Sequence, residues 1–171
     1  MRLFLRALVV VALACTTAAA SAGQTGGAEE LQRFSGTWTS SGALLDTPYS
    51  KAGAATGTTT CAWSDDRLFM ICQQRVSING TLTRALSVYT YDAAQRRYHF
   101  YHMSSSGGSD SSIAVEDNRI TYSDSFTDKG ARITIRTLNV WETANFYRWQ
   151  TDYSNNGGAT WVPMASGTSQ R

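Results

Sequence analysis

Two histidines and two cysteines are the residues of this 171-residue chain whose types and spacing best suit chemistry. His99 and His102 stand three positions apart in an aromatic stretch typical of a β-strand. Residues three apart in a strand point to opposite faces, so this pair cannot chelate one metal ion. We predict no metal site and no cofactor. A single histidine acting as a haem ligand or general base is an alternative to simple packing with one hydrogen bond.

Catalytic motifs are the next features to test. The chain has no G-x-S-x-G elbow and no acidic residue placed to orient either histidine. The serine-rich segment 104–110 lacks the lysine of a phosphate-binding loop, and we predict that it is a loop at the rim of the fold. Paired acids occur at 65–66 and 116–117, where they mark turns. The sequence therefore predicts no catalytic residue.

Cys61 and Cys72 flank the sequence Asp65-Asp66-Arg67. A turn centred between residues 66 and 67 places the two cysteines directly opposite each other on paired strands, near disulfide distance. A reactive redox pair normally shows the closer C-x-x-C spacing. We predict a structural disulfide, which requires an oxidising compartment.

The first 22 residues have the pattern of an export signal. Two arginines precede an apolar run at 7–14, and Ala20-Ser21-Ala22 has the small residues that a signal peptidase accepts. We predict cleavage after Ala22, a disordered lead-in at 23–28 and one domain at 29–171, in the periplasm or outside the cell. Acylation of Cys15 in a lipoprotein is the alternative. No later apolar stretch approaches the roughly 18 residues of a membrane span, so we predict no integral membrane segment.

Charge limits the partners of the mature domain. The chain has 15 Lys and Arg against 13 Asp and Glu, and removal of Arg2 and Arg6 with the leader balances the two. Binding to nucleic acid or to an anionic membrane surface needs clustered positive charge, so we predict neither partner. The oligomeric state is not indicated by the sequence.

We expect β-strands to position these residues, because the sequence has no long helical pattern and only 29–34 suits a short helical turn. Asn79-Gly80 is a strong signal for a two-residue hairpin. Ten short strands joined mainly by hairpins predict an all-β fold, a single antiparallel up-and-down barrel of about ten strands. An immunoglobulin-like sandwich is the alternative. The strand candidates are 36–42, 55–63, 67–78, 81–91, 96–103, 111–116, 119–126, 131–141, 144–153 and 159–168.

Both faces of the strands at 82–91 and 144–153 mix aromatic with hydrogen-bonding side chains. This composition suits a barrel whose lumen holds a small molecule. It suits a filled barrel without a ligand equally well, and the pattern does not show which face is the lumen. The predicted pocket residues are Arg84, Tyr89, His99, Tyr101, Arg136, Tyr147 and Trp149.

The G-x-W sequence Gly36-Thr37-Trp38, after a short helical turn, resembles the signature of lipocalins. The resemblance implies that Trp38 plugs one end of the barrel and packs against an arginine of a late strand, for which Arg136 or Arg148 is available. The segment 154–161 is similar to the Asp-box hairpin, which is structural where it occurs.

The order of these motifs over roughly 31–168 resembles a family of exported bacterial domains of unknown function with a lipocalin-like (calycin) barrel. That resemblance implies a fold and supplies no catalytic residue. The leading functional prediction is binding of a small, partly apolar ligand without catalysis. One alternative is a calycin-type enzyme using a buried Tyr or His with a neighbouring Arg. The other is an interaction module with a filled barrel.

Overall fold

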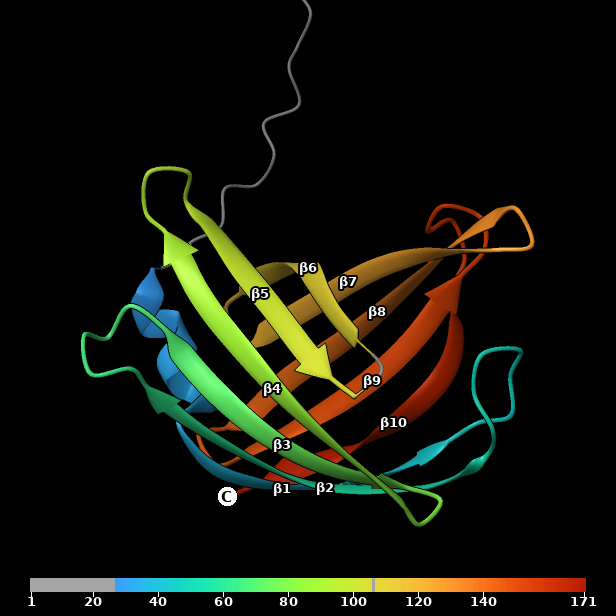
Figure 1. Ribbon diagram of the computed structural model, residues 1–171, viewed down its shortest axis with the longest axis horizontal. Helices are drawn as coiled ribbons and strands as arrows, with labels where there is room; N and C mark the ends of the chain where they lie inside the picture. Colours follow the sequence, from blue (N-terminus) through green and yellow to red (C-terminus); the bar gives the residue numbers. More distant parts are fainter. Residues whose placement is uncertain (1–26, 106) are drawn as a thin grey trace, which may run out of the picture.

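The computed structural model describes residues 27–105 and 107–171, which form one closed antiparallel barrel (Figure 1). Each strand pairs with its neighbours in sequence, and the first strand pairs with the last. A short 3-10 helix, η1 (Ala28–Phe34), precedes the barrel. The ten strands are β1 (Gly36–Leu44), β2 (Gly53–Trp63), β3 (Met70–Ile78), β4 (Thr81–Asp92), β5 (Arg97–Ser104), β6 (Gly107–Glu116), β7 (Arg119–Asp128), β8 (Ala131–Thr143), β9 (Phe146–Ser154) and β10 (Val162–Gln170).

The predicted up-and-down barrel and its short helical turn are confirmed, and the sandwich alternative is wrong because one sheet closes on itself. The predicted leader, with Cys15, and residues 23–26 of the predicted lead-in lie outside the described residues. Gly27 and Ala28 are described, as the N-cap and the first residue of η1. In the described part of the chain, no helix has the length and apolar character needed to cross a bilayer.

Local turn chemistry sets the register of β2, β3 and β4. Asn79 and Gly80 both have positive φ, at 50° and 82°, as the predicted tight hairpin requires. The preceding turn places Cys61 directly opposite Cys72, and the two are joined by a disulfide. The predicted disulfide is therefore present. Since opposite residues share a face of the sheet, these registers also assign faces across three strands.

The serine-rich segment departs from the prediction. We expected a rim loop at 104–110, but β6 begins at Gly107 and pairs with β5 from there onward. Gly and Ser have low intrinsic strand propensity, yet β5 lies alongside and supplies backbone partners for residues 107–111, while β7 pairs only from Ser112 onward. Tertiary pairing thus extends the strand beyond its local signal.

The Asp-box-like loop between β9 and β10 is held by its own side chains. The Ser154 hydroxyl accepts a hydrogen bond from the Gly158 amide at 2.9 Å, and Asn156 Oδ1 accepts one from the Thr160 amide at 3.0 Å. Trp161 follows this turn, and the Arg136 guanidinium lies 4.0 Å from the centre of its ring. The loop thus acts as a structural element on the outside of the barrel.

One end of the barrel is closed by η1. Leu31, Phe34 and Trp38 are almost fully buried there. The Trp38 indole N–H donates a hydrogen bond to the Phe34 carbonyl at 2.9 Å. The guanidinium over its ring belongs to Arg171, at 4.9 Å, at the end of the chain.

The expectation that Arg136 or Arg148 packs on Trp38 is wrong. Arg136 lies over Trp161, and Arg148 lies over Phe146. Both arginines are on the outer face of the barrel, because they alternate with inward-facing neighbours along their strands. Arg171, which follows β10, packs on Trp38 instead, since β10 runs toward the closed end beside β1.

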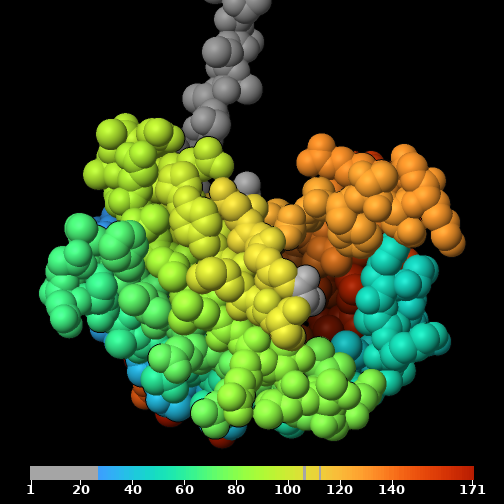
Figure 2. Space-filling view, viewed as in Figure 1, coloured from blue at the N-terminus to red at the C-terminus, as the bar shows by residue number. Residues whose placement is uncertain are grey.

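The opposite end of the barrel is open. The connections after β1, β3, β7 and β9 lie there, because alternate strands of an up-and-down barrel turn at the same end. Figure 2 shows the molecule hollowed between the orange β7–β8 hairpin and the cyan segment that follows β1, with the red C-terminal strands visible inside. Tyr49, in the connection after β1, crosses to this rim and packs on Phe126 and Tyr153 with ring centres 5.5 and 5.0 Å away.

Candidate functional site

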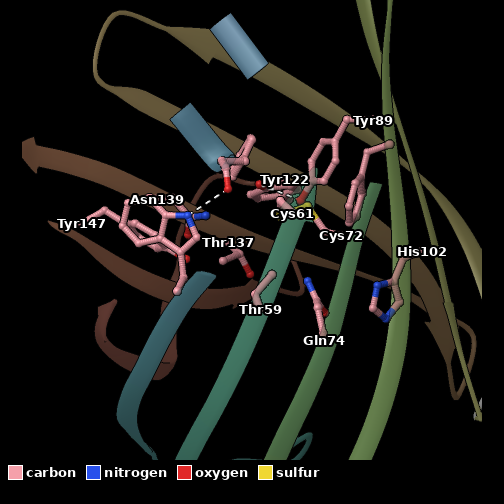
Figure 3. A pocket seen from close by; sticks show the side chains of 13 residues that line it. Thr59, Cys61, Cys72, Gln74, Tyr89, His102, Tyr122, Thr137, Asn139 and Tyr147 are labelled. Atoms are coloured by element: carbon pink, nitrogen blue, oxygen red, sulfur yellow. Dashed lines mark hydrogen bonds between the residues drawn. A yellow bond between two sulfur atoms is a disulfide. The ribbon is translucent and has the colours of Figure 1, made fainter. Parts of the chain in front are cut away.

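The barrel lumen contains an inner cavity of about 310 Å³ next to η1 (Figure 3). Ligand sites in proteins start at about this size. Side chains from η1 and from eight strands converge on the cavity. The lining residues are Phe34, Trp38, Thr59, Cys61, Cys72, Gln74, Tyr89, Phe100, His102, Tyr122, Thr137, Asn139 and Tyr147.

Aromatic rings form the floor of the inner cavity. Phe34 stacks on Tyr89 with ring centres 4.9 Å apart, and Phe100 lies 4.7 Å from Tyr89 and 5.0 Å from Tyr122. The hydroxyls of Tyr89 and Tyr122 are 3.2 Å apart and hydrogen-bonded. Burial raises the pKa of both phenols well above the usual value of about 10, so both are neutral at physiological pH.

A second cavity of about 400 Å³ continues from the first toward the open end. Five residues line both cavities, so we describe them as the inner and outer compartments of one lumen: Thr59, Gln74, Thr137, Asn139 and Tyr147. The outer compartment adds the apolar side chains of Leu44, Ala55, Val76, Ile78 and Trp149, together with the hydroxyls of Ser40, Thr56, Thr151 and Ser169. The lumen therefore changes from an aromatic floor, through a polar junction, to an outer compartment lined by both apolar side chains and small hydroxyls.

Trp149 lies against the wall of the outer compartment because two facing glycines make room for it. Gly42 and Gly167 are opposite each other on β1 and β10. A Cβ atom on either glycine would lie 2.5 Å from the indole ring, a distance that real Cβ atoms do not adopt. The missing side chains thus leave the ring beside the sheet instead of across the lumen.

His102 is the one histidine that lines the lumen. Its Nδ1 atom is 3.0 Å from the Ser87 hydroxyl, and this contact orients the ring. Burial lowers the pKa of His102 below its usual value of about 6.5, which favours neutral imidazole. Ser87 is itself fully buried and does not line the cavity, so the pair does not present a nucleophile to a ligand.

The residues that line the two compartments include no Lys, Arg, Asp or Glu. A ligand carboxylate or phosphate placed there would have no positive side chain to pair with, and burial of an unpaired charge is strongly unfavourable. Within residues 27–105 and 107–171, no three His, Cys, Asp or Glu residues come together as metal ligands would. The site is thus suited to a neutral molecule held by packing and hydrogen bonds.

Three of the seven pocket residues predicted from the sequence lie on the lumen side, where Tyr89 and Tyr147 line the inner compartment and Tyr147 and Trp149 the outer one. The other four are on the outer face, because their positions alternate with lumen-lining neighbours. The expectation that these four residues line the lumen is therefore wrong: they are Arg84, His99, Tyr101 and Arg136.

Arg136 instead lies in a polar cluster outside the barrel. Its Nε atom is 3.0 Å from an oxygen of Asp152, which is 1% exposed, and Gln150 donates to the other oxygen at 2.7 Å. With its guanidinium over the ring of Trp161, Arg136 links β8 to β9 and to the residue that precedes β10.

Sequence reasoning missed the polar junction and the second tyrosine of the floor. Thr59, Gln74 and Asn139 lie in strands where polar residues occur on both faces. Residue type therefore did not distinguish them from the outward-facing polar residues of the same strands. A signal did exist for excluding Arg84. The Asn79-Gly80 turn places Arg84 opposite Arg75, and two arginines facing each other belong on the solvent side of a sheet.

Comparisons with known proteins agree with this barrel. The sequence profile of a family described as "Protein of unknown function (DUF1579)" matches residues 27–171. No curated protein gives a match. Two solved structures of similar fold each share 11% sequence identity with this chain.

The first of these structures is Rv2717c from M. tuberculosis, with a TM-score of 0.56 over 83% of this chain and 96% of that one. The second is the S-type phycobiliprotein lyase CPES from Guillardia theta, with a TM-score of 0.59 over 86% of this chain and 93% of that one. At this identity the likeness shows the fold alone.

Proposed function

The chain belongs to the family described as "Protein of unknown function (DUF1579)", and from its geometry we propose that it binds a small, partly apolar molecule in the barrel lumen without performing chemistry on it. One observation carries the proposal: the lumen is hollow. Its compartments of about 310 and 400 Å³ adjoin, one end is closed by η1, and the other end opens to solvent. A filled barrel would have left no such space.

The residues on which the enzyme alternative depends do not meet in a cavity. That alternative needs Arg84 or Arg136 beside His99 or Tyr101 inside a cavity, and the strand registers place all four on the outside. Within the lumen, burial raises the pKa of the Tyr89 phenol and lowers that of the His102 imidazole, which favours the neutral form of each, and no described charged side chain lines the walls. Such a surface holds a ligand by shape and by hydrogen bonds.

The disulfide supports the further proposal that the mature domain works in the periplasm or outside the cell, after removal of residues 1–22. Cys61 and Cys72 are 3% and 1% exposed and are joined across β2 and β3. Such bridges persist in oxidising compartments and are rare in the cytosol. Expression with the leader, followed by N-terminal sequencing of the exported protein, tests the cleavage after Ala22.

Binding is tested with the neutral fluorophore N-phenyl-1-naphthylamine, whose emission rises in apolar surroundings. We expect saturable enhancement with the wild-type protein. Thr59→Phe fills the junction between the compartments and should weaken binding at least about 10-fold, which corresponds to about 1.4 kcal/mol. Thr58→Phe places the same ring at the neighbouring position, on the outer face of the barrel, and should leave binding unchanged.

The absence of saturable binding, or equal binding by the two variants, would contradict the proposal. Native mass spectrometry of protein purified from its own host, before and after organic extraction, provides the complementary measurement. We expect a ligand mass that extraction removes from the wild-type protein and that is reduced in Thr59→Phe.

A further inference from the structure

Two polar side chains at the junction of the compartments have no hydrogen-bond partner among the residues that the structure describes. Of the five residues that line both compartments, three are already engaged. Thr137 hydrogen-bonds Thr151 at 2.9 Å, Asn139 hydrogen-bonds Tyr122, and Tyr147 hydrogen-bonds Ser169 and Ser40. The remaining two, Thr59 and Gln74, make no side-chain hydrogen bond to any residue that the structure describes.

Thr59 and Gln74 lie next to each other at one level of the lumen. They are directly opposite each other on β2 and β3, and both face the cavity (Figure 3). A hydroxyl and an amide supply donors that suit a carbonyl oxygen. A polar group left without a partner after its water is displaced costs free energy, so a ligand that reaches this depth must offer a hydrogen-bonding group there, and an acceptor oxygen pairs with the donors of both side chains.

The compartments on either side define the rest of the ligand. Below the junction, Phe34, Tyr89 and Phe100 surround a space suited to an aromatic ring, which stacks favourably on such side chains. Above it, Val76, Ile78 and other apolar side chains of the outer compartment suit an alkyl chain. The uncharged lining of both compartments excludes an ionised head group.

We propose that the lumen selects neutral molecules in which an aromatic ring, a carbonyl group and an alkyl chain follow one another, as in aryl alkyl ketones and esters. The ring enters first, the carbonyl oxygen accepts hydrogen bonds from Gln74 and Thr59, and the chain extends to the open end. This inference rests on the proposed binding function and adds the ligand class and its orientation.

Three small probes separate these features: 1-phenyl-1-pentanone has ring, carbonyl and chain, pentylbenzene lacks the carbonyl, and 5-phenylpentanoate bears a charge. Dissociation constants come from displacement of N-phenyl-1-naphthylamine at a pH of about 8. We expect the carboxylate to bind at least about 10-fold more weakly than the ketone.

Substitution of the junction gives the decisive comparison. Gln74→Leu should raise the dissociation constant of the ketone about 3–10-fold, the range of one lost hydrogen bond, and should leave that of pentylbenzene equal or lower. Thr59→Val should act in the same direction. Gln73→Leu is the matched control, because the same change one position away lies on the outer face and should alter neither ligand.

Equal effects of Gln74→Leu on the ketone and on pentylbenzene would overturn the assigned ligand class, as would a carboxylate that binds as tightly as the ketone. In either case the binding function would stand, because the probes still bind. Failure of all three compounds and of the fluorophore to bind the wild-type protein would overturn the function as well. Thermal unfolding of each variant verifies that the comparison concerns folded protein.

Discussion

Trp38→Ala is the substitution that most directly tests how the closed end of the barrel is held. Trp38 is 1% exposed, and its ring contacts Tyr147 with centres 4.9 Å apart. Its N–H donates to the Phe34 carbonyl, and Arg171 covers the ring. Truncation therefore removes packing, one hydrogen bond and one cation–π contact together.

The expected loss follows from the buried area. An indole of about 250 Å² at about 25 cal/mol per Å² corresponds to about 6 kcal/mol, which is an upper bound because the unfolded chain already buries part of its surface. Truncations of buried aromatic residues cost about 3–5 kcal/mol, and we expect Trp38→Ala to lie in this range. Such a loss is a large part of the roughly 5–15 kcal/mol that stabilises a domain of this kind.

Two milder variants separate the contributions. Trp38→Phe keeps most of the apolar area but loses the hydrogen bond to Phe34, so we expect a cost of about 1–2 kcal/mol. Arg171→Ala removes the cation over the ring and its hydrogen bonds to Asn145, Ala144 and Ser35, and the cation–π part is worth about 0.5–1 kcal/mol at an exposed site.

Equilibrium unfolding in urea, followed by far-UV circular dichroism under non-reducing conditions, measures all three variants. The free energy of unfolding should fall most for Trp38→Ala, with an unchanged dependence on urea concentration. A loss below about 1 kcal/mol for Trp38→Ala would refute the conclusion that this ring seals the barrel. It would also mean that η1 is held by its other contacts.

Two further changes address the disulfide and the histidine of the lumen. The Cys61→Ser, Cys72→Ser double variant should fold but lose roughly 3 kcal/mol or slightly less, because the bridge closes a short loop of sequence separation 11, and an unchanged melting temperature or a failure to fold would both contradict this. Burial lowers the pKa of His102, so the unfolded chain binds its proton at higher pH than the folded chain, and the free energy of unfolding should fall as pH drops through about 6.5 toward the folded pKa. Urea titrations at pH of about 7.5 and 5 measure this decline in the free energy of unfolding. His102→Gln should reduce the decline, whereas His99→Gln on the outer face should preserve it. An equal decline in both variants would show that His102 is not responsible.

The sequence by itself determined the strands and much of their register, because turn chemistry is local. Asn79-Gly80 aligns β3 with β4, and the turn at 65–67 sets Cys61 against Cys72. Hairpin connections along the chain also indicated an up-and-down barrel, since strands so joined pair with their neighbours. Each of these inferences depends on residues that lie close together in sequence.

Only the tertiary structure decided which face of each strand is the lumen and which residues meet there. The two faces of β4 and β9 have similar compositions, and the choice between them depends on pairing of β1 with β10 and on packing of η1 across one end. Arg171 reaches Trp38 from 133 positions away along the chain, and Thr59 faces Gln74 at the level where two compartments join. Such contacts are products of closure of the whole sheet, and a pattern with a period of two residues carries no information about the direction in which that sheet curls.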